Sequence, residues 1–85
     1  MTPNEIVDVV KTKCAGDPVF HESLKHAFDR VLDKIGDRAK ARRPVARVFE
    51  VHHENEVARL ALFTAIAEGR SIEKAENEAL ARVGL

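Results

Sequence analysis

The segment from Asp17 to Gly36 constrains the fold of this chain more than any other part of the sequence. Asp17 followed by Pro18 is a typical helix start, because the carboxylate accepts bonds from first-turn amides and proline suits the first helical position. Apolar residues then recur every three or four positions over about four turns. They are Phe20, Leu24, Ala27, Phe28, Val31, Leu32 and Ile35. This pattern predicts a long helix that ends at Gly36 and needs other helices to cover its apolar side.

Start and stop signals of the same kind divide the rest of the chain. The N-terminal residues Thr2–Glu5 form the sequence of a capping box, with a proline at the first helical position. Glycine tolerates the left-handed conformation in which many helices end. The expected helix starts are Thr2, Asp17, Pro44 and Ser71, and the expected stops are Gly16, Gly36, Gly69 and Gly84.

These signals predict one all-α domain over residues 1–85, a small bundle of four to five short helices. The last two helices are expected to form an antiparallel pair around Gly69. An alternating strand through Val45, Arg47, Phe49 and Val51 is the alternative for that part of the chain.

The number of helices depends on the polar segment from Glu50 to Glu56, which lies between two apolar runs. It holds the ionisable residues Glu50, His52, His53, Glu54 and Glu56. A buried unpaired charge costs several kcal/mol, so a dry helix would not accept them all without partners. We therefore expect the helix to end here, with Asn55 or a neighbour capping the next one and the histidines in solvent. A continuous helix that turns some of these groups inward is the alternative.

The same segment suggests a metal site. Glu50 and His53 are three residues apart, as are His53 and Glu56, so on a helix they can converge on one ion. A Glu-x-x-His pair resembles half of a ferritin-like iron site, which also needs carboxylates from facing helices. Glu22 is the expected contributor, and a second copy of the chain would double the ligands. The hypothesis is an iron or zinc site built from Glu and His, between subunits if one copy is short of ligands.

Charge is unevenly distributed along a chain whose net charge is zero. Residues 1–47 hold ten Lys/Arg and seven Asp/Glu, a net +3, and residues 48–85 hold four and seven, a net −3. The basic excess gathers at Arg38, Lys40, Arg42, Arg43 and Arg47. Such a run can contact phosphates, so nucleic-acid binding is a further alternative. No aromatic residue lies between Arg38 and Arg43 to stack on bases, and an acidic protein partner fits as well.

Motifs of known enzyme classes are missing from the sequence: it has no phosphate-binding loop, dinucleotide fingerprint or nucleophile elbow. It has no apolar run long enough to span a membrane and no secretory pattern, and Cys14 is its single cysteine. We expect a cytoplasmic protein that is not an enzyme and has no cofactor unless the metal hypothesis holds.

A chain of 85 residues builds a small core, and a subunit interface would bury more apolar surface. Leu62 and Phe63 are adjacent, so a single neighbouring helix would not cover both. The expected interface consists of Val57, Leu60, Leu62, Phe63 and Ile66. The sequence thus predicts a small adaptor or regulatory protein that acts through protein–protein contact or self-association.

Overall fold

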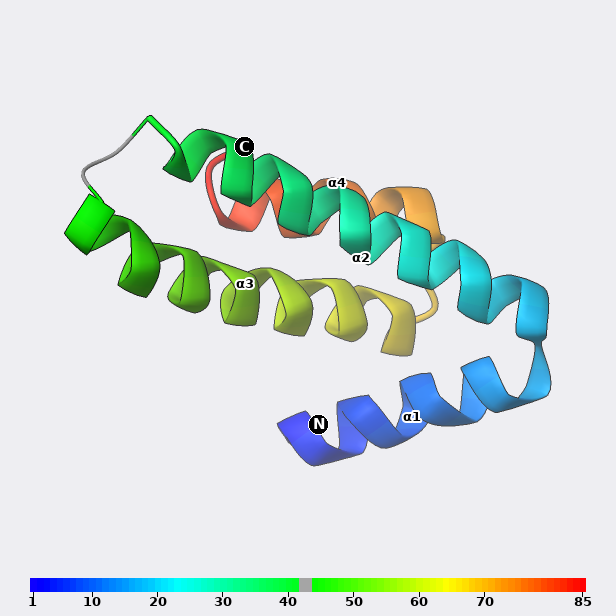
Figure 1. The fold of residues 1–85 in the computed structure, drawn as a ribbon. Coiled ribbons are helices and arrows are strands. Elements are labelled where there is room, and N and C mark those ends of the chain that lie inside the picture. Colours follow the sequence, from blue (N-terminus) through cyan, green and yellow to red (C-terminus); the bar gives the residue numbers. More distant parts are fainter. Residues whose placement is uncertain (42–43) are drawn as a thin grey trace.

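The computed structural model describes the backbone of residues 1–41 and 44–85 and the side chains of residues 1–41 and 49–85. Within these residues the chain forms four helices and no strand (Figure 1). They are α1 (Pro3–Gly16), α2 (Pro18–Ala39), α3 (Pro44–Ala67) and α4 (Ile72–Arg82). The all-α prediction is confirmed, and the strand alternative over residues 45–51 is wrong because α3 spans that segment.

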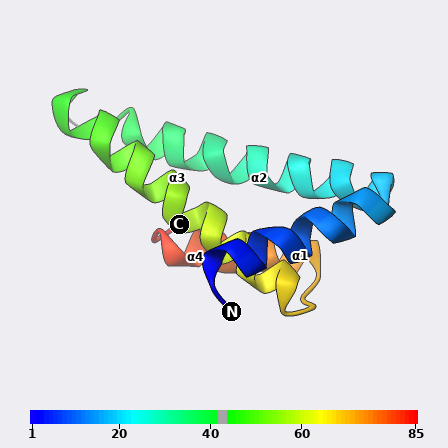
Figure 2. The same ribbon diagram turned by 90° about the horizontal axis from the view of Figure 1, so that it is seen from below.

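The helices are arranged around α2 and α3, each of which contacts every other helix. In the described part of the chain α1 and α4 do not contact one another. Figure 2 shows α1, α4 and the C-terminal half of α3 on the same side of α2. The result is an elongated molecule of 42 × 25 × 18 Å.

The core is formed by the apolar sides of these helices. Its largest fully buried side chains are Val31, Ile35, Leu62 and Ile66. The inner side of α4 carries Leu80 and two alanines, and neither Ala75 nor Ala79 is exposed to solvent. Small side chains let helices approach closely, and α4 makes its most extensive contact with α3.

The predicted helix starts at Thr2, Asp17 and Ser71 are confirmed by their capping hydrogen bonds. The Glu5 amide donates to Thr2 Oγ1 at 3.2 Å, and the Thr2 amide donates back to the Glu5 carboxylate. Asp17 and Ser71 accept amide hydrogen bonds in the same way, at 3.1 and 3.2 Å. These local signals act within one helical turn and do not depend on the rest of the fold.

Two predicted helix ends behave differently. Gly69 has a φ of 89°, and the amide of Arg70 reaches back to the carbonyl of Ala65 at 2.9 Å, which ends α3 in a tight turn. Gly36 lies inside α2, which continues to Ala39. The prediction that α2 stops at Gly36 is wrong because Ala39 is buried and extends the apolar side of the helix beyond the glycine.

The expected break within residues 52–56 is also wrong, since α3 is one continuous helix. Its buried side carries Ala58, Leu62 and Ala65, spaced by four and three residues. His53 and Glu56 fall outside that side and are exposed. Glu54 forms an ion pair with Arg38 of α2. The polar segment therefore continues the helix without burying an unpaired charge.

A bidentate ion pair links α2 to α4. Arg30 donates to the two carboxylate oxygens of Glu76 at 2.7 and 3.0 Å, and the Glu76 side chain is only 13% exposed. The hydrogen bonds from Arg30 are the main cause that lowers the pKa of Glu76, although burial opposes them. The carboxylate form of Glu76 is thus favoured in the folded protein.

Because the folded pKa of Glu76 is lowered, its contribution to stability is fully present above the unfolded pKa. That contribution is lost as the pH falls through the folded pKa. Glu76→Gln is therefore expected to destabilise the protein at neutral pH and to have little effect at a pH below the lowered pKa that Glu76 has in the folded protein. Urea unfolding of both proteins at the two pH values measures this. A stability difference that is the same at both would contradict the assignment.

Candidate functional site

Among the described residues, one side of α3 is not covered by the other helices. Residues three, four or seven apart lie on the same side of a helix. We call this side the α3 face, and it consists of Phe49, His53, Glu56, Val57, Leu60 and Thr64. Phe49 is 77% exposed and Leu60 is 45% exposed, which is unusual for large apolar side chains. The α3 face is therefore an apolar stripe open to solvent, with His53 and Glu56 within it.

Val57 and Leu60 form a ridge between two hollows in the surface. The hollow on the α1 side measures about 300 Å³ and is also lined by Val7 and Phe63. The hollow on the α4 side measures about 590 Å³ and is also lined by Ala61. Both Val57 and Leu60 line both hollows, so the ridge stands between two depressions of the same molecule.

Charged side chains of both signs surround this ridge. Arg70 donates to Glu68 at 2.9 Å and lies 3.1 Å from Glu78, at the rim of the hollow beside α4. The hydrogen bond to Glu68 and the charge of Glu78 raise the pKa of Arg70, so the guanidinium stays charged. On the other rim the guanidinium of Arg59 lies 5.7 Å from the centre of the Phe63 ring. A surface with both signs at its edges can be complementary to itself.

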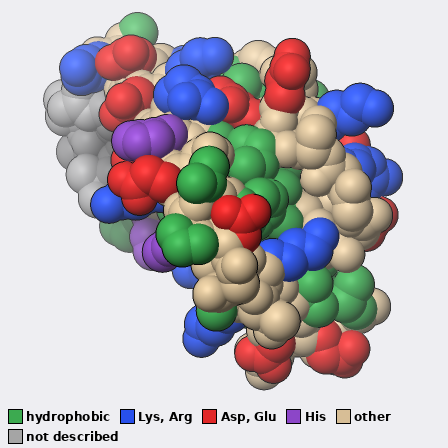
Figure 3. Space-filling model, turned by 90° about the vertical axis from the view of Figure 1, so that its right-hand side faces the viewer, with side chains coloured by type: hydrophobic (Ala, Val, Ile, Leu, Met, Phe, Trp, Pro, Cys, Tyr) green, Lys and Arg blue, Asp and Glu red, His purple; other side chains and the backbone are tan. Residues whose placement is uncertain are grey.

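The view in Figure 3 shows how apolar and charged side chains are distributed on one side of the molecule. Hydrophobic side chains are interspersed there with acidic, basic and histidine side chains.

The structure divides the predicted interface residues into two groups. Val57 and Leu60 form the ridge, and Phe63 is half-buried beside it. Leu62 and Ile66 are 0% exposed and belong to the core, so they offer no surface to a partner. The argument that Leu62 and Phe63 could not both be covered fails because α3 is contacted by three helices rather than one.

Phe49 was missed as a surface residue by the sequence analysis. It lies eight residues before Val57, a spacing that puts both on one side of a helix. That signal exists only if α3 is continuous, and the expected break at residues 52–56 concealed it.

The predicted metal ligands do not all meet within one copy of the chain. Glu50, His53 and Glu56 share one helix, as the hypothesis required. Glu22 lies 16 residues before Arg38 on α2, so it is about 24 Å along the helix from the residue that contacts Glu54. Its neighbour is His26, at 3.8 Å. Among the described residues no group of three or more His, Cys, Asp or Glu gathers. Ligation of iron or zinc between two copies stays a prediction.

The basic run is only partly described. Arg38 is held in the ion pair with Glu54, and Lys40 lies 3.5 Å from Asp37. Arg42 and Arg43 lie outside the described residues, as does the side chain of Arg47. The two described cations of the run thus both have carboxylate partners, and nucleic-acid binding stays a prediction.

Comparisons with protein-family models, curated proteins and solved structures found no match to this chain. None of the helices in the described residues combines the length and the apolar character needed to cross a membrane.

Proposed function

We propose that this protein acts through protein–protein contact, and that the contact is self-association through the α3 face. The observation that carries the proposal is the ridge of Val57 and Leu60 between two hollows. In a two-fold dimer the same surface of both copies meets. The ridge of one copy therefore packs into a hollow on the other copy, and one surface has to carry both the ridge and the hollow. The α3 face carries both features, because Val57 and Leu60 form the ridge and also line the two hollows beside it.

Charge and size support the same arrangement. The carboxylates of Glu56 and Glu68 and the guanidinium groups of Arg59 and Arg82 border the two hollows, so a second copy can oppose unlike charges. A small chain also gains stability from an interface, because binding of the folded form shifts the unfolding equilibrium. The role we propose is that of a small adaptor or regulatory protein in the cytoplasm.

The test is the substitution Leu60→Glu at the centre of the ridge. A carboxylate buried without a partner costs several kcal/mol, and about 1.4 kcal/mol corresponds to a factor of ten. We expect the dimer dissociation constant to rise at least about a hundredfold. Sedimentation equilibrium over a range of concentrations measures it.

The matched control is Val19→Glu on α2. Val19 is 77% exposed and lies outside the α3 face. The substitution therefore introduces the same charge at an apolar surface position away from the ridge. Its dimer dissociation constant should equal that of the unaltered protein. A protein that is monomeric at every concentration, or equal effects of the two substitutions, would refute self-association through this face.

A further inference from the structure

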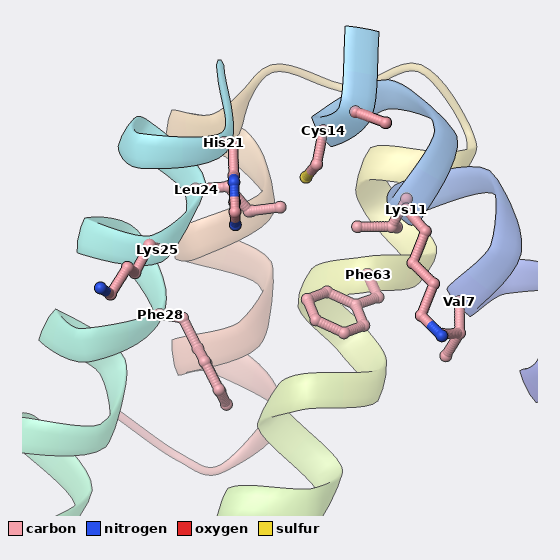
Figure 4. Close-up of a pocket in the computed structure, with 10 residues that line it drawn as sticks. Val7, Lys11, Cys14, His21, Leu24, Lys25, Phe28 and Phe63 are labelled. Carbon is pink, nitrogen blue, oxygen red and sulfur yellow. The ribbon is translucent and has the colours of Figure 1, made fainter. Parts of the chain in front are cut away.

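A cleft opens between α1 and α2, and α3 forms its floor (Figure 4). It measures about 530 Å³. Its apolar lining includes Val10, Leu24, Phe28 and Phe63, which come from all three helices. The volume lies in the range of small-molecule sites, about 300–1,000 Å³.

The connection between α1 and α2 explains why this cleft exists. The two helices are separated only by Asp17, and they diverge from that residue. α1 buries Ile6 and Val10 and contacts both α2 and α3. It is also tied to α3 by Lys13, whose Nζ donates to the carbonyl of Ile66 at 2.9 Å. The rings of Phe28 and Phe63, with centroids 6.2 Å apart, are half-buried below the opening.

The polar groups of the cleft have one sign. Lys11, His21 and Lys25 line it, and no carboxylate of the described part of the chain does. Lys11 comes from α1 and His21 from α2, so basic groups lie on both walls (Figure 4). The remaining ionisable group is the Cys14 thiol, and burial raises its pKa, so it stays uncharged. An apolar floor below basic walls suits a ligand with an apolar body and an anionic head.

We propose that this cleft binds a small amphipathic carboxylate, with its aliphatic or aromatic body against Phe28 and Phe63 and its carboxylate near Lys11 and His21 at the rim. The amphipathic helix of a partner protein fits less well, since such helices dock along grooves of several turns. Here the joint at Asp17 closes one end of the opening. The inference is independent of self-association, which uses the ridge of Val57 and Leu60.

Decanoate, kept below the concentration at which it forms micelles, is the probe. Cys14 is the only cysteine and lines the cleft, so its rate of reaction with a thiol reagent reports occupancy. We expect decanoate to slow this reaction and to raise the thermal unfolding temperature. Decyltrimethylammonium, which has the same chain and the opposite charge, should do neither at equal concentration. Detergent-like action would instead lower the unfolding temperature and speed the reaction, and that result would overturn the proposal.

Two substitutions with matched controls locate the site. The double variant Lys11→Gln/His21→Gln should weaken decanoate binding about threefold to tenfold, as expected for two exposed contacts to a carboxylate, and Lys74→Gln on α4 should not. Ala15→Leu places a side chain in the cleft and should abolish protection of Cys14, while Thr12→Leu on the solvent side of α1 should retain it. Equal effects of a variant and its control, or protection by an acidic amphipathic peptide but not by decanoate, would also overturn the proposal.

Discussion

Replacing Leu62 with alanine is expected to lower the free energy of unfolding by about 2–5 kcal/mol. The Leu62 side chain is completely buried, and its neighbours in the core come from other helices as well as from α3. Removing three carbons there loses apolar burial and leaves a cavity that the surrounding helices fill only in part. Urea or thermal unfolding followed by circular dichroism measures the loss.

The comparison with Leu60 makes this prediction specific. Leu60 stands two residues away on the same helix, but it is 45% exposed. Leu60→Ala removes the same atoms at the same helix propensity and should cost less than about 1 kcal/mol, if measured at concentrations where the protein is monomeric. Similar losses for the two variants would mean that the two leucines are not divided between core and surface as described.

Replacing Ala79 with leucine is expected to destabilise the protein by about 1–3 kcal/mol. Ala79 is 0% exposed on the side of α4 that faces α2 and α3. Alanine and leucine are both good helix formers, so the change acts almost entirely through packing. The larger side chain has to displace α4 from α3 or adopt a strained rotamer.

Ala81→Leu is the control, since Ala81 is exposed on the same helix. Its free energy of unfolding should stay within about 0.5 kcal/mol of the unaltered protein, again at concentrations where the protein is monomeric. If Ala79→Leu were equally harmless, the close approach of α4 to the core would be wrong.

Local chemistry made the helix starts predictable. The capping residues Thr2, Asp17 and Ser71 each act on an amide three residues later, so no knowledge of the tertiary fold was needed. The predicted all-α class followed from these signals and from the spacing of apolar residues.

The two wrong boundaries have a common cause. At Gly36 and at residues 52–56 the sequence holds a local signal for ending a helix, yet the apolar side of the helix continues through it. Burial of that side against other helices outweighs a glycine or a run of ionisable residues, because those residues are either exposed, as His53 and Glu56 are, or paired with another helix, as Glu54 is with Arg38. Sequence spacing alone does not reveal which side the neighbouring helices will cover.

The candidate surfaces were predictable only in part. Val57 and Leu60 were expected at an interface, and the structure leaves both accessible. The cleft below α1 was not foreseen, because it depends on the angle between α1 and α2. That angle is set by contacts between residues far apart in the chain, such as Lys13 with the carbonyl of Ile66.

The absence of contact between α1 and α4 in the described residues has a consequence for how the protein opens. Helices α2, α3 and α4 all contact one another, so they can remain assembled when α1 detaches. Such a sub-global opening needs less free energy than complete unfolding. It exposes only a few buried side chains, Ile6 and Val10 among them, to solvent. We expect the amide protons of α1 to exchange with solvent faster than those of the other three helices. Because α1 forms one wall of the cleft, the same opening would change the width of the cleft.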